Sequence, residues 1–242
     1  MKILKNNDLY SVKIPVSPFF GEMSVYCYFI DGLLIDTGPT IQKRKLSRIY
    51  KLWDIQSVAL THHHNDHSGM VPWLSKHQSP KIFAHEQAGL HNFAEVYPAE
   101  VRTFNYQFFP ISTPAHTLDH VCLLEPNKGW LFTGDLYITA YPKVFLKHES
   151  VSSYIDSLKK LQKLCFHTIF GGHEGRVSNG KEKIMEKIHY LEQVRDEVLR
   201  LHQLGYKDRE IVKKIFPNRV RRELITCGLF SRLNLIRSCY SD

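Results

Sequence analysis

Hydrophobic and polar residues alternate in two stretches near the start of the chain, and this period of two predicts β-strands. The stretches are residues 8–15 and 24–35, and the second contains a tight Asp31-Gly32 turn. A short apolar run from Ser57 to Leu60 predicts a third strand, buried on both faces. Strands of this kind, interleaved with helices, indicate an α/β protein.

Three helices are predicted beside these strands. Residues 41–52 form the first, with Ile41, Ile49 and Leu52 on its inward face and a basic outer face. Residues 69–77 form the second, and residues 85–95 form the third.

A second run of strands and helices follows. Cys122–Leu124 and Trp130–Phe132 predict a hairpin, and Phe166–Phe170 predicts the last strand. A helix is expected between them, capped by Ser152 or Ser153. Residues 136–150 lack either period and predict a loop long enough to cover a site.

The pattern changes at about Ser178, where apolar residues recur at helical spacing and predict one long helix. These residues are Ile184, Ile188, Leu191, Val194, Val198 and Leu201. Shorter helices are predicted at 208–216, 218–227 and 231–240. We therefore expect a main domain over residues 1–177 and a small helical, basic appendage over residues 178–242 that could resemble a winged helix.

The net charge of +8 favours acidic partners or anionic substrates. Residues 206–242 hold nine cationic and four acidic side chains, an excess of +5, so this segment is either a solvated cap or a surface for RNA. The five cysteines are scattered and form no CxxC pair, which indicates reduced thiols in a cytoplasmic protein. Neither a signal peptide nor a membrane span is predicted. The oligomeric state stays open.

A dense cluster of histidines follows the strand at 57–60. The stretch from Thr61 to Gly69 places four imidazoles and a carboxylate within six residues. His62 and His64 stand two residues apart, so an extended backbone puts both rings on one side. Protonated imidazoles would repel each other at this density, whereas neutral imidazoles and a carboxylate are ordinary ligands of zinc. The cluster predicts a metal site.

The cluster, written His62-x-His64-x-Asp66-His67, resembles the HxHxDH signature of the metallo-β-lactamase superfamily. Four further motifs of that family are present in the order that the family has. They are Asp36-Thr37-Gly38, which precedes the cluster, and Thr113 to His120, Thr133-Gly134-Asp135 and Gly171-Gly172-His173, which follow it. In the third motif Ala115 and Asp119 replace glycines, which leaves the local backbone shape in question. The resemblance implies a four-layer αββα sandwich.

The resemblance also implies the roles of individual residues. His62, His64 and His116 would hold one divalent cation, Asp66, His67 and His173 a second, and Asp135 would bridge the two. Zinc is the default metal, with Mn²⁺ or Fe²⁺ as alternatives. Asp66 would also be the catalytic residue, because it could orient a metal-bound hydroxide and pass a proton to the leaving group. Four further residues are assigned to support of the ligands or to substrate contact: Asp36, Thr117, His120 and Tyr137.

The predicted function is a metal-dependent hydrolase that cleaves an ester, thioester or lactone of a small anionic metabolite. Two alternatives stay open. The basic appendage resembles the tail of β-lactamase-like endoribonucleases, and a single iron in a His/His/Asp set would indicate a persulfide dioxygenase.

Several branches of the superfamily are excluded because their characteristic sequence features are missing. No cysteine occupies a ligand position, unlike the cysteine-ligated β-lactamases, and His64 replaces the glutamate of flavodiiron proteins. The segment between Asp135 and His173 is too short for the inserted domain of mRNA-processing nucleases. The nearest groups are glyoxalase II-like hydrolases and the endoribonucleases, although the glutathione-binding segment of glyoxalase II is missing.

Overall fold

The computed structural model describes residues 1–16, 23–218 and 220–240, and its strands form two sheets. The first sheet has the order β1-β2-β3-β4-β5-β6-β7. Its strands are β1 (Lys2–Asn6), β2 (Leu9–Pro15), β3 (Ser24–Ile30), β4 (Leu33–Ile35), β5 (Ser57–Ala59), β6 (Lys81–Ala84) and β7 (Glu95–Val96). Strands β1 to β4 pair antiparallel, and β4 to β7 pair parallel.

The second sheet has the order β13-β12-β11-β10-β9-β8. Its strands are β8 (Val101–Arg102), β9 (Gln107–Ser112), β10 (Val121–Glu125), β11 (Trp130–Gly134), β12 (Thr168–Gly171) and β13 (Gly175–Val177). The predicted hairpin is confirmed, since β10 and β11 pair antiparallel with Leu123 opposite Phe132. Strands β11 and β12 run parallel, so both end at the same edge.

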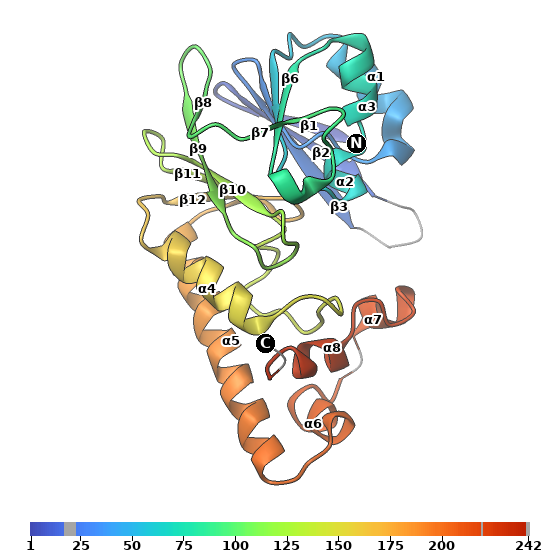
Figure 1. Cartoon of the computed structure of the whole chain (residues 1–242), viewed down its shortest axis with the longest axis vertical. Helices are drawn as coiled ribbons and strands as arrows, with labels where there is room; N and C mark the ends of the chain where they lie inside the picture. The colour runs from blue at the N-terminus through green and yellow to red at the C-terminus, as the bar shows by residue number, and fades with distance from the viewer. Residues whose placement is uncertain (17–22, 219, 241–242) are drawn as a thin grey trace.

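Three buried clusters correspond to the three interfaces of a four-layer sandwich. The middle cluster lies between the sheets and includes Tyr28, Phe108, Phe132 and Phe170. The second cluster packs helices α1 (Lys43–Tyr50) and α3 (Val71–His77) on the first sheet. The third packs α4 (Val151–Gln162) and α5 (Gly180–Gln203) on the second sheet (Figure 1). The predicted αββα fold is confirmed.

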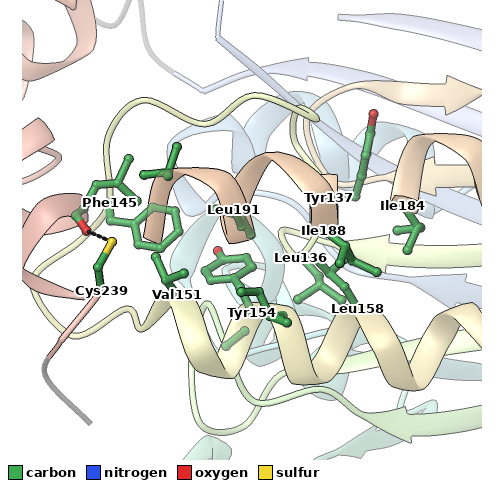
Figure 2. Close-up of a cluster of buried hydrophobic side chains, with 14 of the residues drawn as sticks. Leu136, Tyr137, Phe145, Val151, Tyr154, Leu158, Ile184, Ile188, Leu191 and Cys239 are labelled. Carbon is green, nitrogen blue, oxygen red and sulfur yellow. Dashed lines mark hydrogen bonds between the residues drawn. The ribbon is translucent and has the colours of Figure 1, made fainter. Parts of the chain in front are cut away.

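Helix α5 joins the C-terminal part of the chain to the second sheet. All six residues of its predicted apolar face are buried. Figure 2 shows Tyr154 and Leu158 of α4 beside Ile184, Ile188 and Leu191 of α5. Helices α6 (Asp208–Ile215) and α8 (Arg232–Arg237) share this cluster, and α7 (Arg221–Ile225) lies between them in sequence. The division into two domains at residue 178 stays a prediction.

The inward face predicted for the first helix is wrong at two of its three residues, since only Ile49 packs against the core. Ile41 and Leu52 are 68% and 85% exposed, while Leu46 and Tyr50 are buried. The reason is that Ile41 belongs to a 3₁₀ turn, η1 (Thr40–Gln42), and the α-helix begins only at Lys43, which changes the phase of the buried stripe.

The prediction of a helix at 85–95 is also wrong. Only η2 (Glu86–Ala88) forms, with the His85 ring accepting from the Gln87 N–H. Gly89 then adopts a left-handed conformation (φ +69°) that ends the turn. Among the described residues, no helix is long and apolar enough to cross a bilayer.

Candidate metal centre

The predicted ligand residues come together because each follows the end of a strand. His62, His64, Asp66 and His67 follow β5, the last two within the short helix α2 (Asn65–Ser68). The other three come from the second sheet: His116 follows β9, Asp135 follows β11 and His173 follows β12. Ligand sites of open α/β sheets lie at this carboxyl edge of the strands.

The first group consists of His62, His64 and His116, whose candidate ligand atoms lie within 4.8 Å of one another. His64 Nδ1 and His116 Nε2 are 3.0 Å apart. His62 Nε2 is buried and has no hydrogen-bond partner. Three imidazole nitrogens converging on one point fit a divalent cation with a fourth position left open.

The second group consists of Asp66, His67 and His173, again within 4.8 Å. The Asp66 Oδ2 atom lies 3.8 Å from His67 Nε2 and 3.7 Å from His173 Nε2. These separations are too long for hydrogen bonds and leave space for an ion between the three groups.

Asp135 lies between the two groups and reaches both. Its Oδ2 atom is 3.2 Å from His173 Nε2 and 3.5 Å from His116 Nε2, and its Oδ1 atom is 3.1 Å from His67 Nε2. Despite that last distance, both Asp135 Oδ1 and His67 Nε2 lack a hydrogen-bond partner. Buried polar atoms without partners are costly unless something binds them, so the residues present fit a pair of cations.

Four of the five histidines are held through the ring nitrogen that faces away from the cluster. The Nδ1–H groups donate to Thr61 Oγ1 (3.1 Å, from His62), Asp36 Oδ2 (2.7 Å, from His67), Glu149 Oε1 (2.7 Å, from His116) and the Ser24 carbonyl (2.7 Å, from His173). Such bonds fix the tautomer and direct the Nε2 lone pair toward a metal. Asp36 thus has the supporting geometry expected of it.

Glu149 is the functional residue that the sequence did not reveal. It is buried, accepts from His116 Nδ1 and from the Tyr154 hydroxyl (2.8 Å), and receives the Leu146 N–H. It lies 33 residues from His116, outside all five motifs, in the loop at 136–150. The only indication of this role in the sequence was that the glutamate lies shortly before a predicted helix cap.

The remaining predicted site residues lie close to the cluster in different ways. His120 is fully buried; its Nδ1 bonds Thr113 Oγ1, and its Nε2 accepts from the Asp135 N–H at 3.3 Å. Burial lowers the pKa of His120 to about 3, so the ring stays neutral and positions Asp135. Thr117 borders a cavity of about 740 Å³ beside His64. Tyr137 is buried with the Lys187 ammonium 5.8 Å from its ring centre.

Glycines permit the close approach of the strand ends. A Cβ on Gly172 would lie 2.5 Å from Asp135 Oδ1 and 2.7 Å from His67 Cε1. Gly134 has φ +45°, and its Cβ would meet Thr61 and His120. By contrast, neither Ala115 nor Asp119 has a positive φ, so this backbone does not need the glycines that the family has there.

The pKa values of four of the five histidines in the two groups are shifted, and the direction of the shift differs between the groups. Burial lowers the pKa of His62 well below its ordinary value and that of His64 to about 4. Burial is the largest single effect and acts to lower the pKa of His67 and His173, but the nearby carboxylates together exceed it and raise both pKa values. Asp135 contributes most at each ring, Asp66 adds to both, and Asp36 adds at His67. The Asp135 pKa is well below its ordinary value, because attraction to His173 and His67 exceeds the effect of burial. The rings of His62 and His64 are therefore ready to bind a cation, whereas His67 and His173 must release protons.

We expect the stabilisation by zinc to grow as the pH rises. Without metal, the raised pKa of His67 and His173 contributes stability that is fully present below about 6.5 and is lost as the pH rises through the raised values. A bound cation needs neutral imidazoles, so its contribution changes in the opposite direction. The midpoint of thermal unfolding, measured with zinc and with a chelator from about pH 6 to about pH 8.5, should differ more at the alkaline end. A constant difference would contradict this account.

A cleft of about 620 Å³ opens beside the second group, and we call it the entrance cleft. Asp66 and His173 form part of its lining, Lys13 and Arg221 supply its cations, and most of its other residues are apolar. The apolar residues include Val16, Met23, Pro39, Ile41, Ile138, Ile225, Leu229 and Phe230.

Comparison with known proteins agrees with this geometry. Residues 20–104 and 107–173 match the family model described as the metallo-beta-lactamase superfamily. The chain belongs to the metallo-β-lactamase superfamily, and the matched segments contain all five motifs. A metallo-beta-lactamase family protein from Thermus thermophilus has a similar fold, with a TM-score of 0.69 and 17% identity over 96% of this chain and 91% of that one.

Two curated relatives are more similar in sequence. An atrochrysone carboxyl ACP thioesterase of Aspergillus fumigatus is 28% identical over 84% of this chain and 66% of its own length. A hydroxyacylglutathione hydrolase of Legionella pneumophila is 32% identical over 69% of this chain and 68% of its own length. Across the curated relatives compared, the chain spans from 31% to 71% of their length. The prediction of a superfamily enzyme is confirmed at the level of the family.

Proposed function

We propose that the protein is a metal-dependent hydrolase that cleaves the thioester of a small anionic metabolite, with esters and lactones as chemically related substrates. The observation that carries this proposal is the position of Asp135, whose two oxygens reach both His/Asp groups. A single carboxylate shared by two open groups suits a pair of divalent cations, for which zinc is the default.

We assign the following roles to the residues of the site. His62, His64 and His116 would hold one cation, Asp66, His67 and His173 the other, and Asp135 would contact both. Bound divalent cations supply an acidified water and a Lewis acid for the substrate carbonyl. Asp66 is the most exposed carboxylate of the set, with 23% of its side chain accessible, and it lines the entrance cleft, so it can hold a proton and pass it to the leaving thiolate. His120 positions Asp135, and Glu149 positions His116.

Two features support a thioester with an anionic part. The names of the two relatives above both describe hydrolysis of an acyl–thiol bond. Lys13 and Arg221 line the cleft that leads to Asp66 and His173, where they can attract a negatively charged substrate.

The alternative of RNA cleavage receives less support from the placement of the basic residues. Among the basic residues of the C-terminal segment, Arg221 lines the cleft, whereas Lys213 and Lys214 lie exposed on α6 and do not line it. Arg219 and the side chain of Arg222 lie outside the described residues. Arg232 and Arg237 pair with Glu223 (2.7 Å) and Asp208 (2.9 Å) within the C-terminal segment.

The experiment is a metal analysis followed by a substrate panel. We expect close to two zinc ions per chain and hydrolysis of acyl thioesters above esters, lactones and a short RNA. Chelation should abolish turnover, and added zinc should restore it. One tightly bound iron with no second cation, together with oxidation of a persulfide, would replace the hydrolase with the dioxygenase. Cleavage of RNA alone would replace the thioester as substrate.

A further inference from the structure

The outer wall of the entrance cleft is built by the C-terminal segment. Ile225 at the end of α7, and Leu229 and Phe230 just after it, line the same cleft as Ile41 and Ile138 of the main sandwich. The cleft therefore has apolar side chains from parts of the chain almost two hundred residues apart, and Asp66 and His173 line it as well.

Two of these apolar side chains are exposed. Ile41 is 68% and Leu229 is 62% accessible, although both are large aliphatic residues. Ile41 was expected in the core, but the 3₁₀ turn directs it to the cleft. Aliphatic side chains that gather around a functional site, instead of being scattered singly, mark a surface that receives an apolar group.

The wall is fixed in place by several hydrogen bonds. Phe145, in the loop at 136–150, exchanges backbone bonds of 3.1 and 3.0 Å with Ser231, directly after the wall. Arg232 donates to Glu223 and to the carbonyls of Phe216 and Asn218. Phe145 is itself buried next to Val151 and near Cys239 of the C-terminal segment (Figure 2). The wall is thus anchored on both sides of Ile225 and Leu229.

We infer that the entrance cleft holds an apolar, unbranched acyl chain, with residues 225–230 as its outer wall and specificity element; this inference rests on the proposed thioesterase function. An acyl chain attached to the carbonyl under attack must extend from the metal centre, and this cleft opens there. Its volume of about 620 Å³ lies in the range of small-molecule sites. The cavity beside His64 has polar residues such as His63, Gln87 and His148, which suit the thiol half of the substrate.

The test compares the zinc-loaded full chain on a series of acyl thioesters from acetyl to octanoyl. Each methylene that becomes buried should raise kcat/KM by a factor of about four, until the cleft is filled. Leu229→Glu and Ile41→Glu place a charge in the cleft at positions already exposed, so both variants should fold. In both variants the ratio of octanoyl to acetyl kcat/KM should fall, so that the dependence on chain length is flattened.

Leu224→Glu is the matched control. Leu224 lies in α7, shortly before Leu229 in the chain, and is 60% exposed, close to the 62% of Leu229, but it does not line the cleft. This variant should keep the wild-type dependence on chain length. A wild-type kcat/KM that does not change with length, or equal effects of Leu224→Glu and Leu229→Glu, would overturn the inference.

A binding measurement separates failure of the cleft from failure of the proposed reaction. Straight-chain carboxylates from butyrate to octanoate are titrated into the zinc-loaded protein. If no thioester is hydrolysed but affinity rises with chain length and falls in Leu229→Glu, the cleft inference holds and the proposed reaction fails. If thioesters are hydrolysed and carboxylate affinity is independent of length, the reaction holds and the cleft inference fails.

Discussion

An Asp66→Asn enzyme should fold normally and lose about 100- to 10,000-fold in turnover. The substitution keeps the size of the side chain but removes its charge and its capacity to carry a proton. Asp66 is partly exposed at the start of a four-residue helix, and no described hydrogen bond of the fold depends on its carboxylate. The loss should therefore appear in kcat more than in the free energy of unfolding.

The measurement combines steady-state kinetics, elemental analysis and thermal unfolding on the same preparation. Because Asp66 is also a proposed ligand of the second cation, the assay is repeated at saturating zinc. If full occupancy restores the rate, the Asp66 carboxylate acts only by holding the metal. If a deep loss of kcat persists at full occupancy, the proton-handling role is supported.

Asp135→Asn should have the larger effect on metal binding, because it removes the charge that both groups share. Loss of a residue that merely supports a metal ligand typically costs about 10- to 100-fold in metal affinity. Removal of a carboxylate that contacts both groups should exceed that range and abolish turnover. Zinc at one hundred times its dissociation constant stabilises a protein by about 2.7 kcal/mol, and most of this stabilisation should disappear in the variant.

Asp119→Asn provides the matched control for Asp135→Asn. Both carboxylates are buried and bonded to a histidine of the motifs, but Asp119 contacts His63 (2.8 Å), which belongs to neither group. Zinc titration followed by thermal unfolding should show a normal metal response in Asp119→Asn and almost none in Asp135→Asn. Equal metal responses in the two variants would show that Asp135 is not shared between the cations.

The periodic elements and the ligand cluster could be read from the sequence because each depends on local signals. The apolar face of α5 follows from spacing alone, and all six of its residues are buried. The seven proposed ligands gather because each follows a strand end, and the resemblance to a known family supplied their order. By contrast, the Tyr28 hydroxyl donates a hydrogen bond of 2.6 Å to the Gly171 carbonyl, and no local sequence pattern predicts this contact between the sheets.

What the sequence did not reveal depends on contacts between distant segments. The bond from His116 to Glu149 spans a loop without a regular period, so its partner could not be chosen among the nearby polar residues. The exposure of Ile41 depends on where the first turn of helix begins, a boundary that spacing defines poorly. The apolar wall formed by Leu229 depends on the packing of the C-terminal segment, whereas its sequence is notable mainly for charge.

The division of the proposed ligands between the two sheets has a consequence for the mechanics of the molecule. His62, His64, Asp66 and His67 extend from the first sheet, and His116, Asp135 and His173 extend from the second. A cation pair held by both would act as a cross-link between the halves of the sandwich, comparable to an internal clamp. Neither half alone offers a complete set of ligands, so tight metal binding would begin only after the sheets have docked. The metal would then slow the reopening of the sandwich, making the metal centre a determinant of how long the folded state persists as well as of what it catalyses.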